Sequence, residues 1–213
     1  MSSLPIRNQV EDHLLTPENA ALIVIDYQPV QVNSIASMDR QLLVNNIVGV
    51  AKASKVYNIP TVLSTVNVQT GFNKETIPQL KSVLKDLPSY DRTTINSWED
   101  KEFVEAVKAT GRKKLIMTAL WTEACLTFPV LDALKEGYEV YIVVDAVGGT
   151  SLAAHDAAIR RMEQAGAISI SVAQLFCELQ RDWNRSDTAT DFMKLFVETG
   201  GTAGIQFSYD AAE

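Results

Sequence analysis

The sequence predicts an α/β fold in which helices cover both faces of a mainly parallel sheet. Six short apolar runs alternate along the chain with longer segments of helical periodicity, which is the pattern of successive βαβ units. The first run, residues 20–25, has no polar alternation and therefore predicts a strand that is buried on both faces. For these six strands we expect a doubly wound sheet in the common order 3-2-1-4-5-6.

The predicted elements follow one another in regular alternation. We expect strands at residues 20–25, 61–66, 93–96, 114–120, 139–144 and 167–172, of which the run at 93–96 is the weakest. We expect helices at residues 42–56, 99–110, 126–135, 151–165, 173–180 and 192–197, and a Lys- and Leu-rich segment at 77–87. Gly111 and Gly137 stand where a helix commonly ends, and Ser151 is a candidate N-cap.

The length of the chain fits a single domain. A chain of 213 residues is long enough to bury a large core, which we place at about residues 20–172. Residues 173–213 are expected to form a C-terminal helical extension that packs on this core or on a neighbouring subunit. Neither an internal repeat nor an interdomain linker is visible in the sequence.

Composition and charge narrow the class of partner. The chain is 46% hydrophobic and 21% charged, as in ordinary globular proteins, and its net charge of -7 disfavours nucleic acid and anionic membranes. No apolar run approaches the ~18 residues of a membrane span, and residues 1–15 lack the apolar region of a secretory signal. The two cysteines show no disulfide framework. We therefore expect a cytoplasmic protein that acts on a small molecule.

Two reactive side chains stand at the ends of predicted strands. Cys125 lies where the fourth strand turns into a helix, and a helix N-terminus can lower the pKa of a thiol. Asp26 follows the first strand, which neighbours the fourth in the assumed order. Taken singly, each has an ordinary explanation as a turn former or a buried hydrophobe. Together they predict a carboxylate and a thiol in one crevice at the carboxyl edge of the sheet.

The first turns of the helix after Cys125 are expected to be irregular. Pro129 lies four residues beyond Cys125 and cannot donate the helical hydrogen bond to its carbonyl. That missing bond shapes the site or is merely tolerated there. Cys177, on an apolar helix face, is expected to be inert.

Other candidate motifs are weaker. His155 could serve a Cys–His pair, although a single histidine on a helix more often has a structural role. The run Gly148-Gly149-Thr150 lacks the spacing and the lysine of a phosphate loop, and no GxGxxG motif follows the first strand. With two histidines and no ligand spacing, a metal site is not expected. We therefore expect neither a cofactor nor a metal.

With these residues in place, the chain resembles the isochorismatase-like cysteine hydrolases, which include nicotinamidases and N-carbamoylsarcosine amidases. The resemblance rests on Leu22-Ile-Val-Ile-Asp-Tyr-Gln28, on Thr122-Glu-Ala-Cys-Leu126, on Gly137-Tyr-Glu-Val-Tyr-Ile-Val-Val-Asp-Ala146, and on the segment from His155 to Ala167. Ile95-Asn-Ser-Trp98 and Cys177-Glu-Leu-Gln-Arg-Asp-Trp183 are most similar to the YcaC-like subgroup. The resemblance implies the isochorismatase-like hydrolase fold.

The resemblance also implies a catalytic triad of aspartate, lysine and cysteine. In this resemblance Asp26 matches the base and Cys125 the nucleophile, whereas Arg92 occupies the position that corresponds to the lysine. An arginine keeps its charge and can hold Asp26 and a thiolate in register, but it cannot release a proton. The family has a cis peptide bond before the nucleophile, which maps to Leu120–Trp121. The backbone N–H groups of Trp121 and Cys125 would then form the oxyanion hole.

The resemblance leaves the substrate open. Candidate pocket residues are Gln28, Asn96, Trp98 and Trp121, although either tryptophan equally fits core packing. The metal site of nicotinamidases requires Asp-x-His after the second strand, where this chain has Val66-Asn-Val-Gln69.

The expected activity is hydrolysis of an amide-type C–N bond through a thioester on Cys125. One alternative is an oligomeric binding or scaffold protein with weak turnover, suggested by Arg92 in place of lysine. Another is an ester or carbamoyl hydrolase of the same family; an isochorismate-like substrate is disfavoured because that reaction uses no cysteine nucleophile. The subgroup forms octamers, so we expect a homo-oligomer, in particular an octamer.

Overall fold

The computed structural model describes residues 6–199 and 201–210. Its centre is a six-stranded sheet in which every pair of neighbouring strands is parallel, in the order β3-β2-β1-β4-β5-β6. The strands are β1 (Ala20–Ile25), β2 (Thr61–Val66), β3 (Ser89–Arg92), β4 (Lys114–Ala119), β5 (Glu139–Val143) and β6 (Ile168–Ile170). The predicted fold class and strand order are confirmed.

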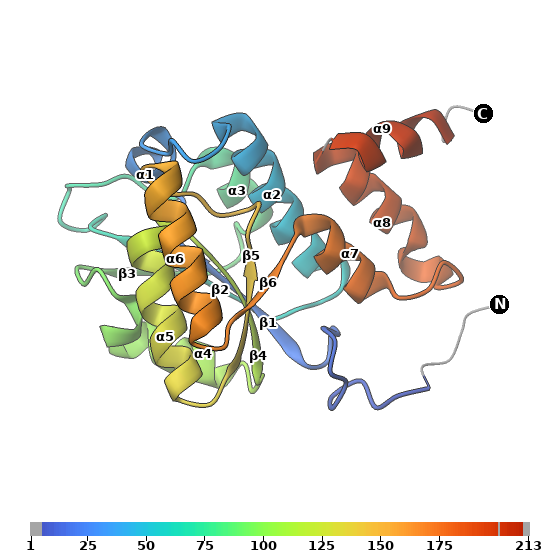
Figure 1. The fold of residues 1–213 in the computed structure, drawn as a ribbon, viewed down its shortest axis with the longest axis horizontal. Coiled ribbons are helices and arrows are strands. Elements are labelled where there is room, and N and C mark those ends of the chain that lie inside the picture. The colour runs from blue at the N-terminus through green and yellow to red at the C-terminus, as the bar shows by residue number, and fades with distance from the viewer. Residues whose placement is uncertain (1–5, 200, 211–213) are drawn as a thin grey trace.

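Helices cover both faces of the sheet (Figure 1). The α-helices are α1 (Pro29–Asn33), α2 (Arg40–Val56), α3 (Pro78–Val83), α4 (Lys101–Ala109), α5 (Thr127–Lys135), α6 (Leu152–Gln164), α7 (Val172–Gln180), α8 (Ser186–Thr199) and α9 (Gly201–Asp210). A 3₁₀ turn at Ser97–Glu99 precedes α4, and a π-helical turn at Thr122–Leu126 precedes α5.

Strand β1 divides the hydrophobic core into two layers. All six of its residues are buried, and successive side chains point to opposite faces of the sheet. Leu22 and Val24 face the layer that α2 and α7 cover, while Ile23 and Ile25 face the layer of α4, α5 and α6. This double burial explains why the strand lacks polar alternation.

The third strand lies earlier in the chain than the sequence predicted. The expected strand at 93–96 is wrong, because β3 is Ser89–Arg92 and pairs with Leu63–Val66 of β2. Residues 93–96 instead lead into the 3₁₀ turn, which Asn96 caps by accepting a hydrogen bond from the Trp98 N–H. The correction places Arg92 at the carboxyl end of β3.

Most helix predictions agree with the structure, and two differ in extent. Ser151 is the N-cap of α6 and accepts a hydrogen bond from the Ala154 N–H at 3.1 Å. The helix expected at 192–197 is longer, because α8 begins at Ser186. The helix expected at 126–135 begins one residue later, because Leu126 closes the π-helical turn and α5 starts at Thr127.

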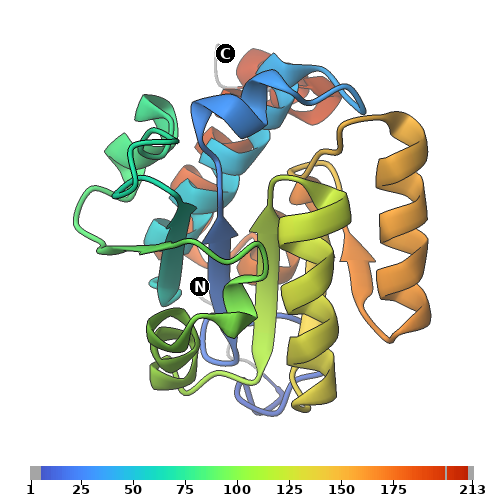
Figure 2. The same ribbon diagram turned by 90° about the vertical axis from the view of Figure 1, so that its left-hand side faces the viewer.

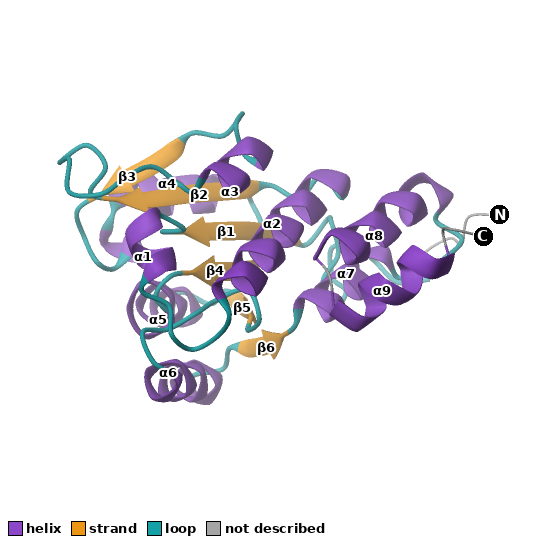
Figure 3. Ribbon diagram, turned by 90° about the horizontal axis from the view of Figure 1, so that it is seen from above, coloured by secondary structure: helices purple, strands orange, loops and turns teal. Residues whose placement is uncertain are grey.

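The last two helices form a layer beyond α2, away from the sheet (Figure 3). Helix α8 packs against α2, and α9 packs against α8. Edge-to-face ring contacts join Trp183, Phe192, Phe196 and Phe207 in this layer. Within the described ranges, no helix has both the length and the apolar character that crossing a membrane requires.

Candidate active site

The strands all point to one edge of the sheet (Figure 2). The predicted site residues lie in segments at or directly after the strand ends on this edge. Asp26 comes directly after β1, Arg92 ends β3, and Cys125 lies in the turn that follows β4. Asp26 adopts a left-handed backbone conformation with φ of 62°, which is uncommon for a residue other than glycine. Its N–H donates to the Ser64 carbonyl of β2, so the neighbouring strand fixes this conformation.

A buried ion pair forms the base of the site. Arg92 donates from Nη1 to Oδ1 and from Nη2 to Oδ2 of Asp26, both at 2.8 Å, and both side chains are almost fully buried. The arginine reaches over β2 and also donates to Ser64 Oγ and the Thr65 carbonyl, both at 3.0 Å. A further bond goes to the Ile95 carbonyl at 3.2 Å. Such paired, planar contacts are the strong form of a carboxylate–arginine interaction.

Cys125 completes the cluster from the π-helical turn. Its side chain is buried, and the thiol lies beside the Asp26 carboxylate and the Trp121 backbone, both of which affect its protonation. The Leu126 N–H bonds the Trp121 carbonyl five residues earlier, which is the π pattern. Pro129 has no N–H with which to continue an ordinary helical ladder back to Cys125. The peptide bond between Leu120 and Trp121 is cis.

Burial dominates the protonation of the site. Burial and, after it, the negative charge of Asp26 together raise the pKa of the Cys125 thiol to about 12, against the opposing effect of Arg92. Burial also raises the pKa of Asp26, although Arg92 acts in the lowering direction. The resting site is therefore a neutral thiol beside an ion pair. The expectation that the helix terminus lowers this thiol's pKa is wrong, because desolvation outweighs it.

The candidate pocket residues are held by the protein's own groups. Gln28 is buried and bonds the Val66 N–H and carbonyl and the Lys74 carbonyl. Asn96 donates a hydrogen bond to Asp132, and Trp121 donates one to Ser34. Trp98 donates one to Glu136 and packs between Phe103 and Tyr138. Trp98 is therefore a core residue, whereas Trp121 is half-buried beside the turn that carries Cys125.

His155, in α6, supports the turn that carries Cys125. Its Nδ1 lies 2.9 Å from Thr122 Oγ1, and burial lowers the pKa of its ring. Thr122 also donates from its N–H to the Gly148 carbonyl, so two elements hold the turn that carries Cys125. Sequence reasoning missed this role and missed Ser64 as a partner of Arg92. A polar residue inside the apolar second strand was the available signal for Ser64.

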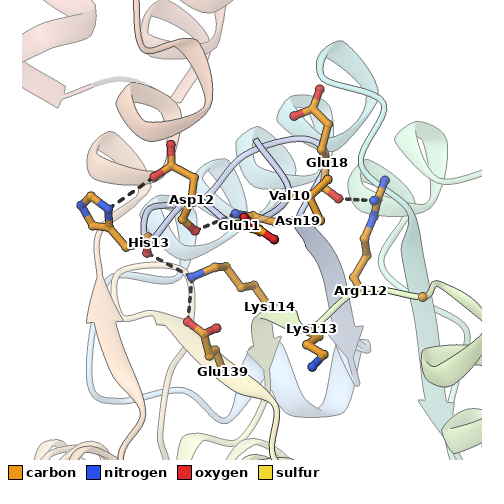
Figure 4. A pocket seen from close by; sticks show the side chains of 11 residues that line it. Val10, Glu11, Asp12, His13, Glu18, Asn19, Arg112, Lys113, Lys114 and Glu139 are labelled. Carbon is orange, nitrogen blue, oxygen red and sulfur yellow. Dashed lines mark hydrogen bonds and ion pairs between the residues drawn. The ribbon is translucent and has the colours of Figure 1, made fainter. Parts of the chain in front are cut away.

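A cavity of about 590 Å³ lies at the opposite edge of the sheet (Figure 4). Asn19 and Lys114, at the amino ends of β1 and β4, contribute to its lining. Lys114 Nζ is already bonded to Glu139 and to the His13 carbonyl, at 2.7 and 3.0 Å. This cavity contains no cysteine and is separated from Asp26 by the length of β1.

The family follows from comparison with known proteins. The model of the isochorismatase domain matches residues 20–174, most of the chain. The chain belongs to the isochorismatase family. The probable hydrolase YcaC of Escherichia coli (strain K12) is 36% identical over 170 residues, which cover 79% of this chain and 81% of that protein. The resemblance to the YcaC-like subgroup is thereby confirmed.

Two solved structures of YcaC superimpose closely on this isochorismatase-family chain. The E. coli protein, described as an octameric hydrolase of unknown specificity, has a TM-score of 0.87 and 33% identity and covers 95% of this chain and 98% of its own. YcaC from Pseudomonas aeruginosa, with hexane-2,5-diol and covalent acrylamide, has a TM-score of 0.87 and 32% identity. The match covers 93% of this chain and 98% of that protein. Among the described residues of this chain, no cluster of three or more His, Cys, Asp or Glu could hold a metal ion.

Replacing Arg92 with methionine is expected to destabilise the fold by about 3–5 kcal/mol, because Asp26 would remain buried without its partner. Equilibrium urea unfolding at neutral pH measures this loss. The double variant Asp26→Asn/Arg92→Met removes both charges and should recover a large part of it. A loss below about 1 kcal/mol in the single variant, the value of an exposed pair, would contradict the role given to this ion pair.

The alkylation rate of Cys125 should depend on pH in a way that reports the raised pKa. In a Cys177→Ala background, iodoacetamide alkylation should accelerate about tenfold per pH unit from about pH 7 to 10 without a plateau, because only the thiolate reacts. In Asp26→Asn the pKa of the thiol should fall, so alkylation at a fixed pH should be faster. A plateau below about pH 8.5, the ordinary pKa of cysteine, would contradict a neutral resting thiol.

Proposed function

We propose that this chain hydrolyses an amide-type C–N bond of a small molecule through a thioester on Cys125. The observation that carries the proposal is the contact of a buried thiol with a carboxylate that Arg92 fixes in place. A nucleophile, its base and a group that orients the base are the parts that covalent catalysis requires.

The first half of the reaction forms the thioester. Asp26 accepts the proton of Cys125, and the sulfur attacks the carbonyl carbon of the substrate. The raised pKa of Asp26 suits a group that must hold this proton. The tetrahedral oxyanion would accept hydrogen bonds from the N–H groups of Trp121 and Cys125, a kind of donor whose loss elsewhere costs roughly 10²–10³ in rate.

The second half releases both products. The tetrahedral intermediate collapses, the C–N bond breaks, and Asp26 returns its proton to the departing amine. A water molecule then loses a proton to Asp26 and attacks the thioester, which releases the acid and regenerates the thiol. Arg92 exchanges no proton in these steps and only orients Asp26, so a permanent charge is compatible with the cycle.

One relative supports a reactive thiol in this family. YcaC of P. aeruginosa carries covalent acrylamide, and acrylamide is an electrophile to which thiols add. By the same relationship, we propose that this chain assembles as a homo-oligomer, in particular as an octamer like E. coli YcaC.

A binding or scaffold protein with weak turnover is the second candidate, favoured by the raised pKa of Cys125 and its burial. An ester or carbamoyl hydrolase of the same family is the third. The two enzyme candidates differ in the bond that is cleaved, whereas the binding protein cleaves none.

Assays of ammonia, amine and alcohol release from a panel of small amides, carbamoyl compounds and esters distinguish these candidates. Wild type and Cys177→Ala should release ammonia or amine from at least one amide, while Cys125→Ala and Asp26→Asn should not. Asp26→Asn is the sharper control, because its thiol should be more readily alkylated and yet lack the proton acceptor. Equal turnover in Cys125→Ala would refute the thioester mechanism, and cleavage of esters alone would refute the amide assignment.

A further inference from the structure

Four large apolar side chains stand exposed around the edge of the sheet that carries Cys125. They are Val30 in α1, Phe72 in the loop after β2, Ile95 after β3, and Leu152 at the start of α6, and they are 54%, 86%, 63% and 60% exposed. Each belongs to a segment that follows the carboxyl end of a different strand, so all four lie on the edge of the candidate site. We call them the apolar rim.

The loop that carries Phe72 is firmly held. Asp91 accepts hydrogen bonds from the Val68 and Gln69 N–H groups at 3.0 and 2.9 Å, and Gln28 donates to the carbonyl groups that flank the loop. Asn73, next to Phe72, donates to Gln31 of α1 at 3.1 Å. Hydrogen bonds along the loop thus hold an aromatic ring out in solvent, where a partner outside the chain can reach it.

The rim and the candidate site share their supports. Ile95 accepts a hydrogen bond from Arg92 through its carbonyl, while its side chain is exposed. Gln28, which holds the Phe72 loop, follows Asp26 by two residues. A contact made at the rim therefore lies at the same edge of the sheet as Cys125.

We propose that the apolar rim is a contact surface between two copies of this chain, in which Phe72 of one copy packs on the rim of the other and covers the entrance to its Cys125. A two-fold contact of this kind places the same patch on both copies. Aromatic and aliphatic side chains with few charges are typical of the centre of such contacts. The E. coli relative, which covers 95% of this chain, is described as octameric. This relationship independently supports a second copy of the chain as the partner that covers the apolar rim.

The proposal rests on the proposed catalytic site for its functional consequence, but the contact can be measured separately. Native mass spectrometry and the rate of acrylamide addition to Cys125 are compared in a Cys177→Ala background. Phe72→Glu should reduce the mass of the assembly and raise the addition rate about tenfold, as the fraction of uncovered sites rises. Phe72→Leu should retain both wild-type values.

The matched control is Ile168→Glu, which introduces the same charge at an exposed apolar residue at the amino end of β6. It should leave both the mass and the addition rate unchanged, and thermal unfolding verifies that each variant remains folded. A monomeric wild type, or a Phe72→Glu variant with unchanged mass and rate, would overturn the proposal. Failure of the wild type to hydrolyse amides would refute the amide assignment and not the rim, because the mass change reports the contact alone.

Discussion

The ion pair between Asp26 and Arg92 joins the carboxyl ends of β1 and β3 across β2, and the candidate site is arranged around it. Both side chains are removed from water, so the pair is retained only because its geometry is bidentate and Ser64, Thr65 and Ile95 satisfy further donors of the arginine. The positive φ of Asp26 aims its carboxylate at this partner. The constraint explains why the third strand ends in a charged residue although it lies in an α/β core.

The same burial determines what the thiol can do. A cysteine at a helix start beside an arginine suggests a thiolate, yet desolvation and the charge of Asp26 raise the pKa of Cys125 to about 12. Nucleophilicity must then arise when the proton moves to Asp26, which at once removes the negative charge that opposes the thiolate. Arg92 remains charged in both states. Its place in the cluster is compatible with a role that requires charge and geometry but no proton transfer.

The sequence revealed the frame of the fold and two of the three central residues. The apolar run of β1 and the mostly β-branched run of β2 placed both strands at their observed bounds, since such residues are typical of buried strands. The third strand was misplaced because Tyr90, Asp91 and Arg92 carry no apolar pattern and are held by side-chain contacts to β2 and its loop. Arg92 was assigned through family resemblance alone. The bonds of Gln28 and the pKa of Cys125 depend on tertiary packing, which no local pattern encodes.

The central claim is that Cys125 carries the acyl group between the two halves of the reaction. The most direct measurement is peptide mass mapping after acid quench of the protein mixed with an amide that it cleaves. The account predicts an acyl mass on the peptide that contains Cys125 during turnover and its disappearance when the amide is exhausted. Turnover with no acyl mass on Cys125, or with the acyl group on Cys177, would contradict the account.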